Sequence, residues 1–308
     1  METGAIVVCV SRRWWVNYWD LLRSFRNDTP VGPNRFFSFV KVEHTLFSVP
    51  LIFAGMFLAL KGIPSAAQAA LILAAATGAR TVSFALNRII DRQIDRLNPR
   101  TADRELPAGR MTLREAAAVL AVGLVVYLTS AALLNTLCLI LSPIPLVVFV
   151  AYPHMKRFTS LSHFGVGSGL ALGALGGWIA VRPSLADAEP GLLLTFFTLF
   201  WATGFDIIYS TLDESFDRDQ KLYSLPSRLG RKRALQIAAL LHIVAFGLLA
   251  VLFVAYLKSL PAFPFLILAG VLLYFEHEKA EDVDIAFFKI NAIEGFAVLG
   301  MVLFGLFA

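Results

Sequence analysis

The fold is decided by residues 66–109, which read AAQAALILAAATGARTVSFALNRIIDRQIDRLNPRTADRELPAG. Residues 66–90 of this stretch are mostly apolar, and about 20 mostly apolar residues suffice for a helix to cross a bilayer. Charged residues then follow one another closely from Arg88 to Arg104. The stretch therefore predicts a membrane-spanning helix that ends in a charged, polar segment.

The whole chain has the composition of a membrane protein. Its 308 residues are 57% hydrophobic and 16% charged, and its mean hydropathy is +0.70. A soluble domain is roughly 45–50% apolar and about 25% charged, so a water-soluble enzyme is excluded. Eight further apolar runs accompany residues 66–90: 37–60, 113–133, 136–152, 163–181, 190–212, 234–257, 261–276 and 285–307. Together they predict an all-α polytopic membrane protein, with nine transmembrane helices in a bundle around a central cavity.

The distribution of basic residues predicts the orientation. Of the 27 Lys and Arg residues, Lys61, Arg182 and Lys258 lie in one set of alternate loops, and Arg80 lies inside the second apolar run. The other 23 (27 − 4) lie near the N-terminus or in and beside the opposite set of loops. Because basic residues accumulate on the cytoplasmic side of membrane proteins, we expect a cytoplasmic N-terminus.

The N-terminal residues 1–35 are predicted to form a basic, amphipathic tail that rests on lipid headgroups, because they mix aromatic and basic residues, as in Arg12-Arg13-Trp14-Trp15. Residues 36–308 are predicted to form one intramembrane domain. The net charge of +5 (27 − 22) is assigned to loops that face an anionic membrane surface. Nucleic acid is therefore not an expected partner.

The charged segment contains a ladder of oxygen ligands. Asn87, Asp91 and Asp95 are four residues apart, so they share one face of a helix. Carboxylates at this spacing repel one another unless a cation lies between them. Oxygen ligands without Cys or His suit a hard cation such as Mg²⁺, which typically takes one or two carboxylates plus substrate phosphates.

A second ladder follows the sixth apolar run. Asp213, Asp217 and Lys221 repeat the four-residue spacing. Asp206 lies two turns earlier, inside the apolar run itself. An ionisable group within a membrane is costly and indicates a functional site. A single block of this kind is as consistent with a solvated helix end as with a site. Two blocks at corresponding helix ends favour a clamp for two divalent ions and a diphosphate.

Basic residues beside both ladders provide partners for phosphate oxygens that metal ions leave uncovered. Arg binds such oxygens with a fork geometry and Lys as a point charge. The candidates are Arg100, Arg104, Lys156, Arg157 and Lys221. Taken alone, Lys156-Arg157 is more typical of a topology anchor than of a ligand.

These motifs resemble the signatures of the UbiA-type intramembrane aromatic prenyltransferases. The first signature corresponds to Asn87-x-x-x-Asp91-x-x-x-Asp95 followed by Arg100-Thr and Arg104-x-Leu-Pro-x-Gly, and the second to Asp213-x-x-x-Asp217-x-x-x-Lys221. The segment Tyr152-Pro-x-Met-Lys-Arg-Phe-Thr is similar to the one after that family's fourth helix. The chain departs from the family pattern at Arg88, where many members have Asp. Among subgroups it most resembles the 4-hydroxybenzoate polyprenyltransferase-like proteins, which include enzymes of the futalosine route to menaquinone.

The resemblance implies Mg²⁺-assisted transfer of a prenyl chain from an isoprenyl diphosphate to an aromatic acceptor, a precursor of a quinone or menaquinone. It further implies a bacterial cytoplasmic (inner) membrane protein whose site faces the cytoplasm. Metal ligands are then expected at Asn87, Asp91, Asp95, Asp206, Asp213 and Asp217, and the aspartates of both ladders are catalytic. The acceptor, the prenyl length and the oligomeric state are not determined.

The reaction passes through an allylic cation that must be shielded from water, and aromatic faces stabilise cations. Tyr152 and Tyr209 are the candidates for this role, each on a run that ends at a motif. Glu43 and His44 begin the first run and are candidates for binding the acceptor or for an interfacial polar cap. Six glycines of the fifth run allow either close helix packing or room for a prenyl tail: Gly165, Gly167, Gly169, Gly173, Gly176 and Gly177.

Two other classes of membrane protein remain as alternatives. A phosphatidyltransferase acting on alcohols also uses aspartates at four-residue spacing, but within one contiguous Asp-Gly-x-x-Ala-Arg motif that this chain lacks. A transporter with an aspartate-lined path predicts charges near mid-membrane and often an inverted repeat. The two ladders instead recur in one orientation, which favours the transferase.

Overall fold

A computed structural model describes residues 34–41, 45–282 and 289–308, and the regular elements among these residues are all helical. In chain order the α-helices are α2 (Asn34–Val40), α3 (Thr45–Leu60), α4 (Ala66–Leu97), α5 (Leu113–Leu134), α6 (Thr136–Leu141), α7 (Pro143–Met155), α8 (Ser162–Val181), α9 (Glu189–Ser210), α10 (Glu214–Asp219), α11 (Leu225–Leu229), α12 (Arg231–Leu252), α13 (Phe263–Glu278) and α14 (Asn291–Phe307).

Among the described residues, seven helical segments are long and apolar enough to cross a membrane: Ala66–Leu97, Leu113–Leu134, Thr136–Met155, Ser162–Val181, Glu189–Asp219, Arg231–Leu257 and Leu260–Glu278. They correspond to the second to eighth apolar runs of the sequence. Two shorter apolar helices, Ser48–Leu60 and Asn291–Phe307, occupy the first and ninth runs. The described residues thus form the expected all-helical membrane protein.

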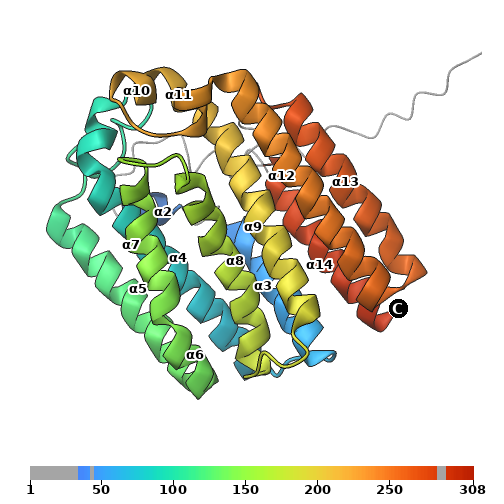
Figure 1. The fold of residues 1–308 in the computed structure, drawn as a ribbon. Coiled ribbons are helices and arrows are strands. Elements are labelled where there is room, and N and C mark those ends of the chain that lie inside the picture. The colour runs from blue at the N-terminus through green and yellow to red at the C-terminus, as the bar shows by residue number, and fades with distance from the viewer. Residues whose placement is uncertain (1–33, 42–44, 283–288) are drawn as a thin grey trace, which may run out of the picture.

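The long helices lie side by side, and α10 and α11 lie across one end of the bundle (Figure 1). Helices α5, α6 and α7 form one flank, α12, α13 and α14 form the other, and α3, α4, α8 and α9 lie between them. The loop that follows α4 is at the same end as α10 and α11. This arrangement gathers two chain segments that are far apart in sequence, the loop after α4 and the segment of α10 and α11, at one end of the bundle.

Helix α9 is central to the hydrophobic core. Its residues Leu194, Phe197 and Trp201 are fully buried, as expected for a helix that is apolar on all sides. The Phe197 and Trp201 rings stack with centroids 6.0 Å apart, and Trp201 Nε1 donates a 3.0 Å hydrogen bond to Asn291 Oδ1 of α14. Large apolar side chains on the outer helices, such as Ile243, are exposed, which suits a surface in contact with lipid.

Helix α4 is longer than the apolar run that predicts it. It begins with a capping box between Ser65 and Gln68 and continues through both aspartates of the first ladder to Leu97. Its 32 residues span about 48 Å at about 1.5 Å per residue, more than the roughly 30 Å of a bilayer's hydrocarbon core. A proline ring disfavours α-helical backbone geometry at the residue before it. Pro99 therefore keeps Asn98 out of the helix, which ends just after the ladder.

Several predicted runs are broken. The first run is divided between α2 and α3, and Lys41 after α2 has a positive φ of 50°. The fourth run is divided at Ser142, immediately before Pro143. In the sixth run, α9 ends at Ser210. The chain then forms a 3₁₀ turn, Thr211–Asp213, before α10 begins. The second ladder therefore does not lie on one continuous helix.

The glycines of the fifth apolar run have different roles in α8. A Cβ on Gly177 would lie 1.9 Å from the Ile52 carbonyl oxygen of α3, and one on Gly55 of α3 would lie 2.2 Å from the Ala174 carbonyl oxygen. The backbones of α3 and α8 therefore approach each other directly at these glycines. A Cβ on Gly176, in contrast, would have no heavy atom within 4 Å.

Candidate active site

The two aspartate segments are in direct contact. Asn98, the residue after α4, donates a 2.8 Å hydrogen bond from Nδ2 to Asp213 Oδ1. Arg100 donates from Nε to the same oxygen at 2.8 Å and from Nη2 to Asp213 Oδ2. The Asn98 side chain also accepts from the Arg100 backbone N–H at 3.0 Å, which fixes the turn that presents Arg100. The structure thus joins the two sequence motifs at one end of the bundle.

Asp91 is buried on the inner face of α4, with 2% of its surface exposed. Its Oδ2 accepts a 2.6 Å hydrogen bond from Lys156 Nζ and a 3.1 Å bond from Asn87 Nδ2, and its Oδ1 lies 3.4 Å from Arg157 Nη2. Lys156 and Arg157 follow α7, so the third predicted segment also reaches the first ladder. Both side chains therefore contact Asp91, in addition to lying in a basic loop.

Asp95 is buried one turn further along α4. Arg104 Nη1 lies 2.8 Å from both of its carboxylate oxygens. The Thr101 hydroxyl donates to the Asp95 carbonyl oxygen at 3.0 Å. The chain after α4 therefore folds back over the helix end, and the spacing from Asp95 to Arg104 places the charges opposite each other.

Arg100 also contacts Tyr209, one of the two predicted aromatic residues. Its Nη1 donates a 2.6 Å hydrogen bond to the Tyr209 hydroxyl, and its guanidinium carbon lies 4.9 Å from the ring centroid. Burial disfavours the charged guanidinium, but the hydrogen bonds to Asp213 and Tyr209 outweigh burial and raise the pKa of Arg100 above its ordinary value. Arg100 is therefore a permanent positive charge between the second ladder and the ring.

Asp206 has a partner that the sequence interpretation missed. His163, buried in the first turn of α8, places Nδ1 2.7 Å from Asp206 Oδ2, and its Nε2 accepts a 3.2 Å hydrogen bond from the Leu225 N–H. Because Nε2 accepts, Nδ1 carries the proton and donates to Asp206. No local pattern predicts this pair, since the two residues are 43 positions apart.

Asp217 and Lys221 are arranged differently from the predicted ladder. Asp217 lies in α10 and has the Ser224 side chain nearby. Lys221 follows the end of α10 with a positive φ of 57° and an exposed side chain. It does not stack on Asp217, because the helix has already ended.

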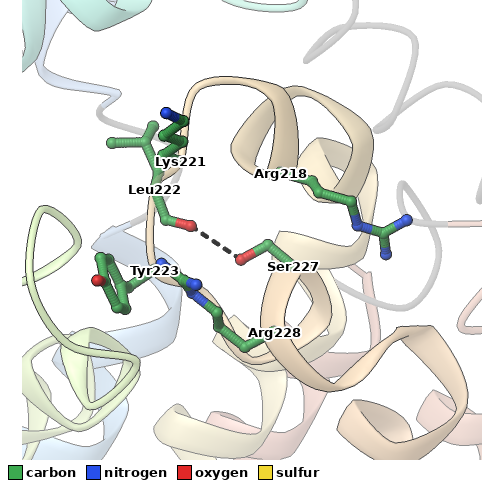
Figure 2. Close-up of a pocket in the computed structure, with 6 residues that line it drawn as sticks. All are labelled: Arg218, Lys221, Leu222, Tyr223, Ser227 and Arg228. Carbon is green, nitrogen blue, oxygen red and sulfur yellow. Dashed lines mark hydrogen bonds between the residues drawn. The ribbon is translucent and has the colours of Figure 1, made fainter.

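Lys221 instead lines a shallow depression of about 430 Å³ at the surface. Figure 2 shows its lining residues, with the Ser227 hydroxyl donating to the Leu222 carbonyl oxygen at 3.0 Å. Arg218 and Arg228 also line the depression, and the Arg228 guanidinium lies 3.6 Å from the Tyr223 ring centroid. The Tyr223 N–H donates to the Lys156 carbonyl oxygen at 2.7 Å, which ties this loop to the end of α7.

Tyr152, the other predicted aromatic residue, lies on α7 against α8. A Cβ on Gly165 would lie 2.5 Å from Tyr152 Cβ, so the glycine lets this tyrosine pack closely. The Tyr152 hydroxyl interacts with the Ser83 side chain of α4. Glu43 and His44, the predicted acceptor-binding residues, lie outside the described residues.

The donor set suits a hard divalent cation. The aspartates of both ladders offer only oxygen ligands, and in the described part of the chain no three His, Cys, Asp or Glu side chains are close enough to one another to hold a metal ion together. The two buried carboxylates of the first ladder, Asp91 and Asp95, are paired with basic side chains. This fits Mg²⁺, which uses one or two carboxylates and completes its coordination with phosphate oxygens and water.

Comparisons with known proteins identify the family of the chain. A family model described as the UbiA prenyltransferase family matches residues 48–292. The 4-hydroxybenzoate octaprenyltransferase of Coxiella burnetii is 29% identical over 293 residues, covering 92% of this chain and 95% of the relative.

Solved structures share the fold. The apo structure of a UbiA homolog from Aeropyrum pernix K1 has a TM-score of 0.78 and 35% identity, covering 85% of this chain and 98% of that one. A UbiA homolog from Archaeoglobus fulgidus bound to GPP and Mg²⁺ has a TM-score of 0.61 and 19% identity, covering 88% and 98% of the two chains. With the two ladders joined at one end of a helical membrane bundle, these matches show that the chain belongs to the UbiA prenyltransferase family.

Proposed function

We propose that this protein transfers a prenyl chain from an isoprenyl diphosphate to an aromatic acceptor of the quinone or menaquinone precursor type. The observation that carries the proposal is the contact of Asn98 and Arg100 with Asp213, which places both aspartate ladders and their basic residues around one region. The Coxiella relative is named for transfer to 4-hydroxybenzoate, which supports the same class of reaction here.

The metal of the proposed reaction is Mg²⁺. We assign it to the carboxylates of Asp91 and Asp95 on one side and of Asp213 and Asp217 on the other, with Asn87 and Asp206 as further oxygen ligands. When bound, Mg²⁺ supplies Lewis-acid stabilisation of the departing diphosphate. The oxygen-only donor set of the described site supports this choice over a softer metal.

The basic residues of the site have a second role in this proposal. Lys156, Arg157, Arg104 and Arg100 pair with the carboxylates of Asp91, Asp95 and Asp213. A carboxylate that coordinates a metal ion holds these side chains less strongly, so their N–H groups can turn to the phosphate oxygens. The exposed Lys221 is assigned to contact the diphosphate when the diphosphate enters or leaves the site.

The prenyl group then reacts within the bundle. The bond between the allylic carbon and the diphosphate oxygen breaks, and its electron pair leaves with the diphosphate. Tyr152 and Tyr209 shield the allylic cation, because aromatic faces stabilise positive charge and the apolar surroundings exclude water. A ring carbon of the acceptor forms the new carbon–carbon bond and then loses its proton. Glu43 and His44 remain predicted acceptor-binding residues.

We further propose nine membrane spans, a cytoplasmic N-terminus, and a site that faces the cytoplasm of a bacterial inner membrane. The two shorter apolar helices, Ser48–Leu60 and Asn291–Phe307, complete the seven longer ones. The proposed site lies at the end of the bundle that carries α10 and α11 (Figure 1), where the basic loops gather. Residues 1–35 are assigned to a tail on the membrane surface.

A transfer assay with the purified protein tests the proposal. We expect radiolabelled geranylgeranyl diphosphate and Mg²⁺ to give a prenylated product with at least one member of a panel of hydroxybenzoates and hydroxynaphthoates. Removal of Mg²⁺ with EDTA should abolish the product, and added Mg²⁺ should restore it. The proposal is wrong if folded protein gives neither product nor diphosphate with any aromatic acceptor.

A further inference from the structure

A second group of polar side chains is buried outside the candidate active site, where α9, α12, α13 and α14 meet. We call it the acid cluster, and its members are Trp201, His242, Glu276, His277, Asn291 and Glu294. Every member except His277 is at most 3% exposed. Helix α14 ends far from α10 and α11 (Figure 1), so Glu294, in the first turn of α14, lies toward the end of the bundle that carries them.

The nitrogen atoms of the acid cluster have partners. The Trp201 indole N–H donates to Asn291 Oδ1 at 3.0 Å, and Asn291 Nδ2 donates to Glu276 Oε1 at 3.1 Å. His242 Nε2 lies 3.2 Å from the Trp201 carbonyl oxygen, and His242 Nδ1 lies 3.0 Å from His277 Nε2. Because a carbonyl only accepts, His242 Nε2 carries the proton and its Nδ1 accepts from His277. These bonds are complete with both imidazoles uncharged.

Three carboxyl oxygens of the acid cluster, in contrast, have no donor. Glu276 Oε2 and both Oε atoms of Glu294 are fully buried and have no hydrogen-bond partner among the described residues. His242 Nδ1 lies 3.8 Å from Glu276 Oε2, which is longer than a hydrogen bond. A carboxylate buried in a membrane protein without a donor or a cation is costly. The two glutamates are also within electrostatic range of each other, so two negative charges would repel.

No basic side chain that the structure describes compensates these two acids. Helix α3, which packs against α14, has no charged residue between Thr45 and Leu60. Helices α9 and α12 face the acids with Trp201 and His242, and His277 of α13 is bound to His242. Lys289, which precedes α14, forms no hydrogen bond with the three unpaired oxygens. The acids must therefore lose their charge in another way.

We propose that Glu276 and Glu294 form a proton-binding site, in which both carboxyl groups keep their protons at neutral pH and join α13 to α14 as neutral acids. Protonation removes both negative charges and gives each acid an O–H donor. Protons fit the cluster better than a metal ion, because no three His, Cys, Asp or Glu side chains of the described chain are close enough together to hold one. The inference is independent of the proposed function.

The site makes the stability of this flank depend on pH. A glutamate in the unfolded chain titrates near about pH 4.3, so at neutral pH the folded protein holds protons that the unfolded chain has released. Raising the pH then lowers the free energy of unfolding. Above about pH 7 the two histidines are mostly uncharged in the folded and the unfolded protein, so within the cluster the glutamates determine this dependence.

The test compares wild type with Glu294→Gln and Glu276→Gln, because glutamine has the shape of a protonated glutamate but cannot ionise. The matched control is Glu278→Gln, which changes an exposed glutamate on α13, two residues from Glu276. Two properties of the purified protein in detergent are measured. One is the infrared absorption of carboxylic acid carbonyl groups at neutral pH, and the other is the unfolding temperature between about pH 7 and about pH 9.

Glu294→Gln is expected to remove part of the carboxylic acid absorption of wild type, whereas Glu278→Gln should retain all of it. The unfolding temperature of wild type should fall with rising pH more steeply than that of Glu294→Gln, by about 2–4 °C per pH unit for the one proton removed. The variant should therefore be the more stable protein at about pH 9. Glu276→Gln should behave in the same way, and it provides the comparison if Glu294→Gln does not fold.

Three results overturn the inference. If neither glutamine variant changes the carboxylic acid absorption, both glutamates are charged. If the unfolding temperatures of both variants follow that of wild type across the pH range, the cluster holds no proton that the unfolded chain releases. If Na⁺ or K⁺ raises the unfolding temperature of wild type at about pH 9 but not that of the variants, the acids bind a metal ion instead. A protein that transfers no prenyl group contradicts the proposed function alone, because neither measurement requires activity.

Discussion

Asp213→Ala is expected to reduce the rate of prenyl transfer by about a hundredfold to a thousandfold, the loss that follows removal of one preorganised group that stabilises a transition state. Asp213 accepts hydrogen bonds from Asn98 and Arg100, so it connects the two ladders. Its loss removes a proposed metal ligand and also frees Arg100. Because Arg100 can still contact Tyr209, we expect the variant to fold. The measurement is kcat with saturating diphosphate and acceptor.

Asp219→Ala is the matched control for this prediction. Asp219 is the last residue of α10, close in sequence to the ladder, but its side chain is exposed. We expect Asp219→Ala to retain activity within about twofold, as surface substitutions away from specific contacts usually have little effect. Near-wild-type kcat in folded Asp213→Ala would show that the metal assignment at the second ladder is wrong.

Gly177→Val is expected to prevent the protein from folding. A Cβ at this position would lie 1.9 Å from the Ile52 carbonyl oxygen and 3.2 Å from the Met56 backbone nitrogen, and neither backbone atom can move without separating α3 from α8. Overpacking of a core typically costs about 1–3 kcal/mol, and a clash between two helix backbones should exceed this range. The measurement is the yield of monodisperse protein in mild detergent, together with its unfolding temperature.

The adjacent glycine provides the control. Gly176 is on the same helix, but a Cβ there would have no heavy atom within 4 Å. Gly176→Val should therefore give folded protein with an unfolding temperature close to that of the wild type. If Gly177→Val and Gly176→Val behave alike, the direct packing of α3 on α8 is not as described.

Much of the fold can be predicted from the sequence, because a bilayer requires long apolar helices. The second apolar run predicts α4, and the run 163–181 matches α8, Ser162–Val181, almost residue for residue. The breaks are harder to predict. Pro143 marks the division of the fourth run. No proline or glycine marks the end of α9 at Ser210, so the change from α-helix to a 3₁₀ turn at Thr211–Asp213 has no signal in the sequence.

The residues of the candidate site can also be found from the sequence, but their pairing cannot. The four-residue spacing identifies Asp91 and Asp95, whereas the contact of Arg100 with Asp213 depends on how distant helices pack. His163 shows the same limit, since a single histidine at the start of an apolar run carries no local signal. The burial of Arg88 is likewise a tertiary property, because the sequence identifies it only as an arginine beside the ladder.

The central claim is that the buried aspartates bind Mg²⁺ and thereby release their basic partners to the diphosphate. The most direct measurement is the Kd of a non-hydrolysable geranyl thiodiphosphate for the purified protein, determined by titration calorimetry with Mg²⁺ and with EDTA. We predict tight binding that requires Mg²⁺ and is lost in Asp213→Ala. Equal affinity with and without the metal would contradict the claim, because Lys156 and Arg104 would then bind the diphosphate while still holding Asp91 and Asp95.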